Sequence, residues 1–272
     1  MARIEMTGVS VDFPIYHVNR RSLKHTVLAA VAGRRASQRF GTDASQRVVV
    51  RALRDIDFTL DRGDRLGIVG VNGAGKTTLL RVLAGIYEPV QGSVRVMGDI
   101  SALIDPTLGM NAELTGRENI MLRGLTNRMS AEAIARLEED VREFSELGDF
   151  IDLPVRFYSS GMVVRLGFAL ATAIRPEVLL MDEWLMAGDA TFIEKARTRL
   201  EDMVRGADIL VLSSHVPAII AQWCTRVMRL EQGRIVDDGP TREVLERYLG
   251  YALPDVAAEL QQPPIIPIAN PA

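Results

Sequence analysis

The chain has 272 residues, of which 47% are apolar and 25% charged, with a formal net charge of −3 at pH 7. This composition is ordinary for a globular protein of one large domain or two small ones, and the acidic balance argues against nucleic acid as a partner. The single cysteine, Cys224, excludes a disulfide framework and fits a reducing compartment. The longest apolar stretches are far shorter than the ~20 residues of a spanning helix, so membrane contact is expected to be peripheral or through a partner.

The first part of the chain contains two predicted strands, residues 2–13 and 48–60, separated by a basic insertion at residues 17–47. Within the insertion, apolar residues recur at helical spacing from Leu23 to Val31, which predicts a short amphipathic helix over residues 22–33. Only one acidic residue, Asp43, offsets the seven basic ones, which are Arg20, Arg21, Lys24, Arg34, Arg35, Arg39 and Arg47.

The rest of the chain alternates strands and helices, which predicts an α/β fold. A helix at residues 130–147 is expected to begin after Ser130, a good capping residue. The proline-rich end, residues 251–272, is predicted to be disordered or extended. Strands are predicted at residues 65–70, 92–98, 177–183, 208–215 and 225–236, and further helices at 76–86, 163–174, 216–224 and 241–250.

A glycine-rich loop, "GVNGAGKTT" at residues 70–78, follows the strand at 65–70 and opens the next helix. Its spacing matches the phosphate-loop motif in the structural context that supports such a match. The glycines let backbone N–H groups turn toward an anion, Lys76 reaches the outer phosphates and the Thr77 hydroxyl can bind Mg²⁺. The nucleotide-binding residues predicted here are Gly70, Asn72, Gly73, Ala74, Gly75, Lys76, Thr77 and Thr78.

Two acidic residues, Asp182 and Glu183, end the apolar strand "EVLLMDE". Adjacent acids after a strand are as typical of a loop cap as of a site. Beside a phosphate loop, the pair favours Asp182 as a Mg²⁺ ligand and Glu183 as the carboxylate that polarises an attacking water.

A second anion-binding helix start is predicted at "YSSGM", residues 158–162, where Ser159, Ser160 and Gly161 precede an apolar helix. One phosphate chain seldom needs two such sites unless the second serves a neighbouring subunit. His215 follows a buried strand in "SSH" and is predicted to contact the γ-phosphate, although a lone histidine is more often structural.

The order of phosphate loop, serine–glycine segment, Asp–Glu strand end, "AGD" at residues 187–189 and "SSH" resembles the ATP-binding subunit of ABC transporters over roughly residues 2–250. The resemblance implies a P-loop NTPase core with a small antiparallel β subdomain and a helical subdomain at about residues 105–165, together forming an ATP-binding domain at residues 1–250. It also implies ATP and Mg²⁺ as cofactors. A head-to-tail homodimer driven by ATP would bring Lys76, Asp182 and Glu183 of one copy to Ser159 and Gly161 of the other.

Several segments narrow the resemblance to the ATPases of bacterial polysaccharide exporters of the O-antigen, teichoic-acid and capsule type. They are "YSSGM", "EFSELGDF" at residues 143–150, "LTGRENI" at 114–120 and the basic insertion. This resemblance implies ATP hydrolysis that energises export of a lipid-linked glycan through a separate permease, at the cytoplasmic face of the inner membrane. Contact of the basic insertion with anionic lipid headgroups or a glycan diphosphate is a further expectation. The alternative is an ABC ATPase for another exported substrate, or one that acts away from membranes.

The sequence departs from the family pattern at three places. Asp105 stands where the family usually has a glutamine that touches Mg²⁺. Ser160 and Met162 replace the glycine and glutamine of the usual serine–glycine segment. The aromatic residue that stacks on adenine is either Tyr16, which is favoured, or Phe13.

Overall fold

The computed structural model describes residues 1–15, 40–42, 48–105, 109–183 and 190–253. Its internal contacts divide the chain into two compact units. We call Arg3–Met97 with Val211–Ala272 the phosphate-loop unit, and Met1–Ala2 with Gly98–Leu210 the helical unit. The helix predicted at residues 22–33 lies outside the described residues, as does the tail from residue 254 onward. The predicted domain boundaries stay a prediction.

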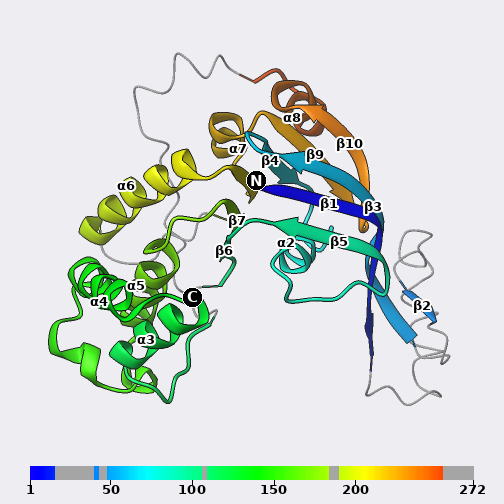
Figure 1. Ribbon diagram of the computed structural model, residues 1–272. Coiled ribbons are helices and arrows are strands. Elements are labelled where there is room, and N and C mark those ends of the chain that lie inside the picture. The colour runs from blue at the N-terminus through cyan, green and yellow to red at the C-terminus, as the bar shows by residue number, and fades with distance from the viewer. Residues whose placement is uncertain (16–39, 43–47, 106–108, 184–189, 254–272) are drawn as a thin grey trace. The chain divides into compact units, whose positions relative to one another are not determined.

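The phosphate-loop unit contains a four-stranded antiparallel sheet in the order β2-β3-β1-β5, the β subdomain that the family resemblance implies. Figure 1 shows β1, β3 and β5 running side by side. Alternate side chains of β1 are buried, and a bulge at Gly8 (φ 58°) shifts the register so that Val9 and Val11 stay on the buried face. The strands are β1 Arg3–Pro14, β2 Phe40–Thr42, β3 Val48–Asp61 and β5 Gln91–Met97.

The same unit contains the strand that leads into the phosphate loop. This strand, β4 (Arg65–Val69), is almost wholly buried and pairs in parallel with β9. A turn at Gln232–Gly233, both with positive φ, separates the strands predicted at residues 225–236, which are β9 and β10 and pair antiparallel. The other elements are α2 Lys76–Leu83, α7 Pro217–Trp223, β9 Arg226–Glu231, β10 Arg234–Pro240 and α8 Thr241–Leu249.

The helical unit combines a parallel strand pair, β6 and β7, with four helices. Its core contains three phenylalanines from three helices: the rings of Phe144 and Phe168 stack with centroids 5.8 Å apart, and Phe192 meets both edge-on. Such ring pairs contribute beyond their buried area. The elements are β6 Ile100–Leu103, α3 Gly116–Thr126, α4 Ala131–Ser145, α5 Ser160–Thr172, β7 Val178–Asp182 and α6 Ala190–Gly206, with short 3₁₀ turns η1 Gly148–Asp152 and η2 Val155–Phe157; β8 Ile209–Ser213 crosses into the phosphate-loop unit.

The predicted cap of α4 is confirmed, because the Ser130 hydroxyl accepts a hydrogen bond from the Ala133 N–H at 3.3 Å. The predicted helices and strands outside the masked segments are also confirmed, with ends shifted by up to four residues. The helix predicted at residues 76–86 ends at Leu83, just before Gly85 turns left-handed at φ 71°. In the described part of the chain, no helix combines the length and the apolar character needed to cross a bilayer.

Cys224 lies between α7 and β9 in the chain with 6% of its surface exposed, and burial raises the pKa of its thiol to about 12. Because the thiolate is the reactive form, we expect the native protein to react with a disulfide reagent such as DTNB at pH 8 at least ~100-fold more slowly than the protein unfolded in guanidinium. The chain has no other cysteine, so the signal belongs to this residue alone. Equal rates for native and unfolded protein would contradict the burial.

Candidate functional site

The phosphate loop joins the end of β4 to the start of α2, as predicted. Its three glycines have φ angles of 151° at Gly70, 76° at Gly73 and 116° at Gly75. A Cβ atom at Gly70 would lie 2.3 Å from the carbonyl oxygen of Leu230, and one at Gly75 would lie 2.8 Å from that of Ala52. Glycine is therefore needed both for these backbone angles and for the close approach of neighbouring strands.

Two backbone hydrogen bonds hold the loop against the rest of its unit. The carbonyl of the fully buried Ala74 accepts from the Gly233 N–H at 2.8 Å. The carbonyl of Gly233 in turn accepts from the Arg54 N–H in β3 at 2.7 Å. The turn between β9 and β10 thus connects the loop to β3.

Lys76, the first residue of α2, is only 7% exposed, and its ammonium group donates to the carbonyl of Gly70 at 2.8 Å. Asn72 and Gly73 form the exposed tip of the loop, whereas Thr77 and Thr78 are half-buried in the first turn of α2. No side chain caps this helix, and its first turn contains no acidic residue. The N-terminus of α2 therefore combines its dipole and a buried cation, which suits a phosphate chain.

His215 also belongs to the phosphate-loop unit, two residues beyond the end of β8. Its side chain is exposed. The preceding residue, Ser214, is buried and accepts a hydrogen bond from the Val216 N–H at 3.1 Å, which fixes the turn before α7. The strand β8 is a neighbour of β4 in the sheet. Contact of His215 with a γ-phosphate stays a prediction.

The three predicted carboxylates all follow or end the parallel strands β6 and β7 of the helical unit, at the carboxyl ends of these strands. These strands are parallel, with Leu103 opposite Met181, so Asp105 follows β6 at the edge where Asp182 ends β7. Glu183 is exposed and has a φ of 62°. This left-handed conformation is uncommon for a residue with a long side chain. Carboxylate oxygens are ligands that Mg²⁺ prefers.

The second predicted anion site, the start of α5, is also in the helical unit. The Ser159 hydroxyl caps the helix by accepting from the Met162 N–H at 3.3 Å. Ser159, Ser160 and Gly161 are all exposed, and a Cβ at Gly161 would have no neighbour closer than 4.0 Å. The helix start is therefore open to a ligand or to a second protein surface.

Of the two candidate adenine platforms, only Phe13 lies among the described residues; Tyr16 lies outside them. Phe13 is half-buried at the end of β1, and its ring meets that of Tyr87 edge-on with centroids 5.1 Å apart. The Tyr87 hydroxyl accepts from the Arg81 guanidinium of α2 at 3.1 Å. Tyr87 was not among the predicted residues, because its neighbours are distant in sequence.

The predicted site residues thus fall into two groups. Phe13, the phosphate loop and His215 belong to the phosphate-loop unit. Asp105, Asp182, Glu183 and the start of α5 belong to the helical unit. In the described ranges, no cluster of three or more histidine, cysteine or acidic side chains forms a metal site by itself.

Comparison with known proteins agrees with the geometry of the phosphate loop, because both indicate an ATP-binding protein. A family model described as ABC transporter matches residues 53–186. The O-antigen export system ATP-binding protein RfbE of Yersinia enterocolitica is 42% identical over 239 residues, covering 88% of this chain and 98% of that protein. RfbB of Myxococcus xanthus, of the same description, is 40% identical over 84% of this chain but only 50% of its own length, so this chain spans half of that relative. A solved ATP-binding subunit of an ABC transporter aligns with a TM-score of 0.65 and 21% identity, over 95% of this chain and 99% of that structure.

The fold is therefore that of an ABC-type ATP-binding cassette, and the chain belongs to the ATP-binding proteins of the ABC transporter family. Within that family, the resemblance to the polysaccharide-exporter type is confirmed by the two O-antigen export relatives.

Proposed function

We propose that this chain is the ATP-hydrolysing subunit that energises export of a lipid-linked polysaccharide, of the O-antigen kind, through a separate membrane permease. The observation that carries the proposal is 42% identity over 98% of an O-antigen export ATP-binding protein. The glycines with positive φ and the buried Lys76 support the ATP-binding half of the proposal, because they build a phosphate site from this chain's own residues.

In the proposed mechanism, the N-terminus of α2 and Lys76 hold the phosphates of ATP. Thr77 and Asp182 would hold Mg²⁺, which would neutralise charge on the phosphates. Glu183 orients and polarises the attacking water, and His215 contacts the γ-phosphate. Ser159 and Gly161 of a second copy complete each site, so hydrolysis requires a head-to-tail homodimer.

The proposed export function is tested in the organism that carries the gene and with the purified protein. Deleting its gene should stop the glycan from reaching the cell surface and leave the lipid-linked form inside, and restoring the gene should reverse both effects. The purified chain should release phosphate from Mg-ATP, and a membrane-spanning partner should co-purify with the tagged protein from detergent-solubilised membranes. Normal surface glycan in the deletion strain would refute the glycan substrate while leaving the ATPase assignment intact.

We further propose that the subunit is peripheral at the cytoplasmic face of the inner membrane and that the basic insertion contributes to this placement. Three of its cations, Arg20, Arg21 and Lys24, are close in sequence to the apolar residues of the segment 22–33. Each cation near an anionic lipid or diphosphate contributes on the order of 1 kcal/mol, and salt weakens the effect.

Replacing Arg20, Arg21 and Lys24 together with glutamine should therefore leave the ATPase rate of the detached subunit within about twofold of wild type, because the insertion precedes the phosphate site. The same triple variant should reduce glycan export by the assembled transporter, measured as surface glycan per cell. If this variant exports glycan at the wild-type rate, the three cations face solvent and do not contribute to export.

A further inference from the structure

Two segments of the helical unit lie side by side, and the second of them leads directly into α5. One is the segment 111–119, which contains most of "LTGRENI", and the other is the segment 150–158. The Val155 N–H donates to the Leu114 carbonyl and the Arg156 N–H to the Ala112 carbonyl, each at 2.9 Å. The buried Asn119 side chain holds the first segment from inside: its amide donates to the Asn111, Leu114 and Thr115 carbonyls and its oxygen accepts from the Asn111 N–H.

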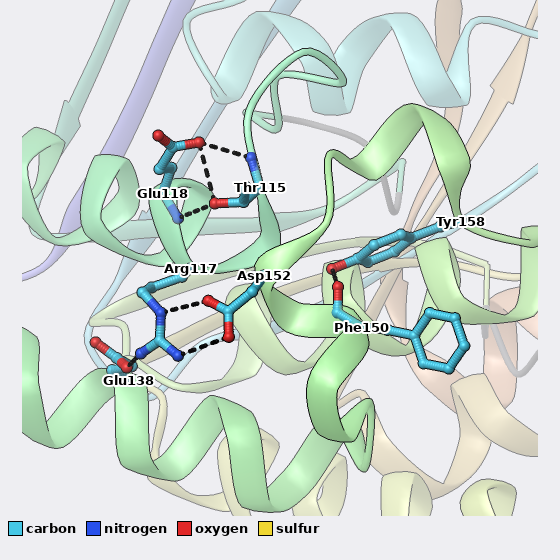
Figure 2. Close-up of polar contacts among 7 residues, drawn as sticks. All are labelled: Thr115, Arg117, Glu118, Glu138, Phe150, Asp152 and Tyr158. Atoms are coloured by element: carbon cyan, nitrogen blue, oxygen red, sulfur yellow. Dashed lines mark hydrogen bonds and ion pairs between the residues drawn. The ribbon is translucent and has the colours of Figure 1, made fainter.

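The two segments are also joined by an arginine clasp, which Figure 2 shows. Arg117 donates from Nε to Asp152 Oδ1 at 2.7 Å and from Nη2 to Asp152 Oδ2 at 3.1 Å, and its remaining Nη1 meets Glu138 of α4. These hydrogen bonds lower the pKa of Asp152 and raise that of Arg117, so both stay charged. A two-pronged pair fixes orientation as well as distance.

A second connection lies at Tyr158, directly before Ser159. Tyr158 is 9% exposed, and its hydroxyl donates to the Phe150 carbonyl at 2.7 Å (Figure 2). Its hydroxyl also packs against Gly116, where an added Cβ would lie only 2.6 Å away. Gly116 thus contacts Tyr158, the residue directly after η2, and Arg117 contacts Asp152, the last residue of η1.

The position of the α5 start follows from these contacts. One peptide bond separates Tyr158 from Ser159, whose hydroxyl caps α5, so the anchored ring limits where the exposed Ser159–Gly161 segment can lie. The Ser159–Gly161 segment itself is exposed, and the Ser159 hydroxyl accepts its hydrogen bond from the Met162 N–H of the same helix.

We infer that Arg117, Asp152 and Tyr158 are positioning residues for the second anion-binding site, which they hold in the geometry that receives the γ-phosphate of a partner copy. This inference rests on the proposed function, in which Ser159 and Gly161 complete the site of the second copy. The segment "LTGRENI" thus contributes to dimer formation and not to nucleotide binding by a single copy.

The experiment measures ATP-driven dimerisation by sedimentation in the Glu183→Gln background. Adding Arg117→Gln, Asp152→Asn or Tyr158→Phe should leave binding of a fluorescent ATP analogue by the monomer within about twofold, yet weaken dimerisation about tenfold or more, because small misplacements of a reacting group are costly. Arg117 and Asp152 act as one pair. Dimerisation of the Arg117→Gln/Asp152→Asn double variant should therefore be no weaker than dimerisation of the more affected single variant.

Arg247→Gln is the matched control, because Arg247 makes an equally two-pronged pair with Asp237 (2.8 and 2.9 Å) in the phosphate-loop unit. Wild-type dimerisation by the Arg117, Asp152 and Tyr158 variants, or equal weakening by Arg247→Gln, would overturn the inference. Failure of the Glu183→Gln parent to dimerise with Mg-ATP would instead refute the two-copy site of the proposed function. If Arg117→Gln unfolds, Tyr158→Phe alone decides the outcome, because it removes a single hydroxyl.

Discussion

Glu183→Gln is expected to bind Mg-ATP with near wild-type affinity and to hydrolyse it at least ~100-fold more slowly, in line with the contribution of a general base. Glutamine keeps the size of the side chain but cannot accept a proton from water. The exposed Glu183 lies directly after Asp182, the last residue of β7, and has a φ of 62°. Steady-state phosphate release together with nucleotide titration measures both quantities.

The same variant should accumulate as an ATP-bound dimer, whereas the protein without nucleotide stays largely monomeric. Each exposed α5 start has a capping serine and no acidic residue in its first turn, so ATP supplies the negative charge that joins two copies. Near-normal turnover would refute the role of Glu183, and a dimer of equal strength with and without Mg-ATP would count against the two-copy site.

Much of the fold could be predicted because short-range signals specify it. Apolar runs located β7 and β8, and Ser130 located the start of α4. Two helices for which we made no prediction also carried such signals. Thr115 and Glu118 form a capping box that opens α3. In α6, Phe192, Ala196 and Leu200 recur every four residues and are all buried.

Other features could not be predicted because they depend on residues distant in sequence. Arg117 and Asp152 are 35 positions apart, and "LTGRENI" by itself indicates neither partner. Phe13 meets Tyr87 only because the end of β1 and the segment that follows α2 approach one another in the folded unit. The phosphate loop was predictable as a motif, but its dependence on β3 and on the β9–β10 turn was not, because those supports come from residues 52–54 and 230–233.

Because the loop rests on β9, Gly70 is the position in the phosphate loop where adding a single methyl group should weaken Mg-ATP binding most. A Cβ there would lie 2.3 Å from the Leu230 carbonyl oxygen, a backbone atom of β9 that cannot move aside as a flexible side chain does. The loop must shift instead, and with it the Gly70 carbonyl that accepts from Lys76 at 2.8 Å. Overpacking of this kind costs about 1–3 kcal/mol.

Gly70→Ala should therefore weaken Mg-ATP binding by about 5- to 150-fold, if that cost falls on the phosphate-binding conformation. Gly85→Ala is the matched control: Gly85 also has a positive φ, 71°, but a Cβ there would meet nothing within 4 Å. Both variants place an alanine at a positive φ, 151° at Gly70 and 71° at Gly85, but only at Gly70 does the added methyl group meet the backbone of β9. Titration with a fluorescent ATP analogue, alongside thermal unfolding without nucleotide, should show lost affinity in Gly70→Ala alone. Equal affinities for the two variants would mean that the loop binds phosphate without its support from β9.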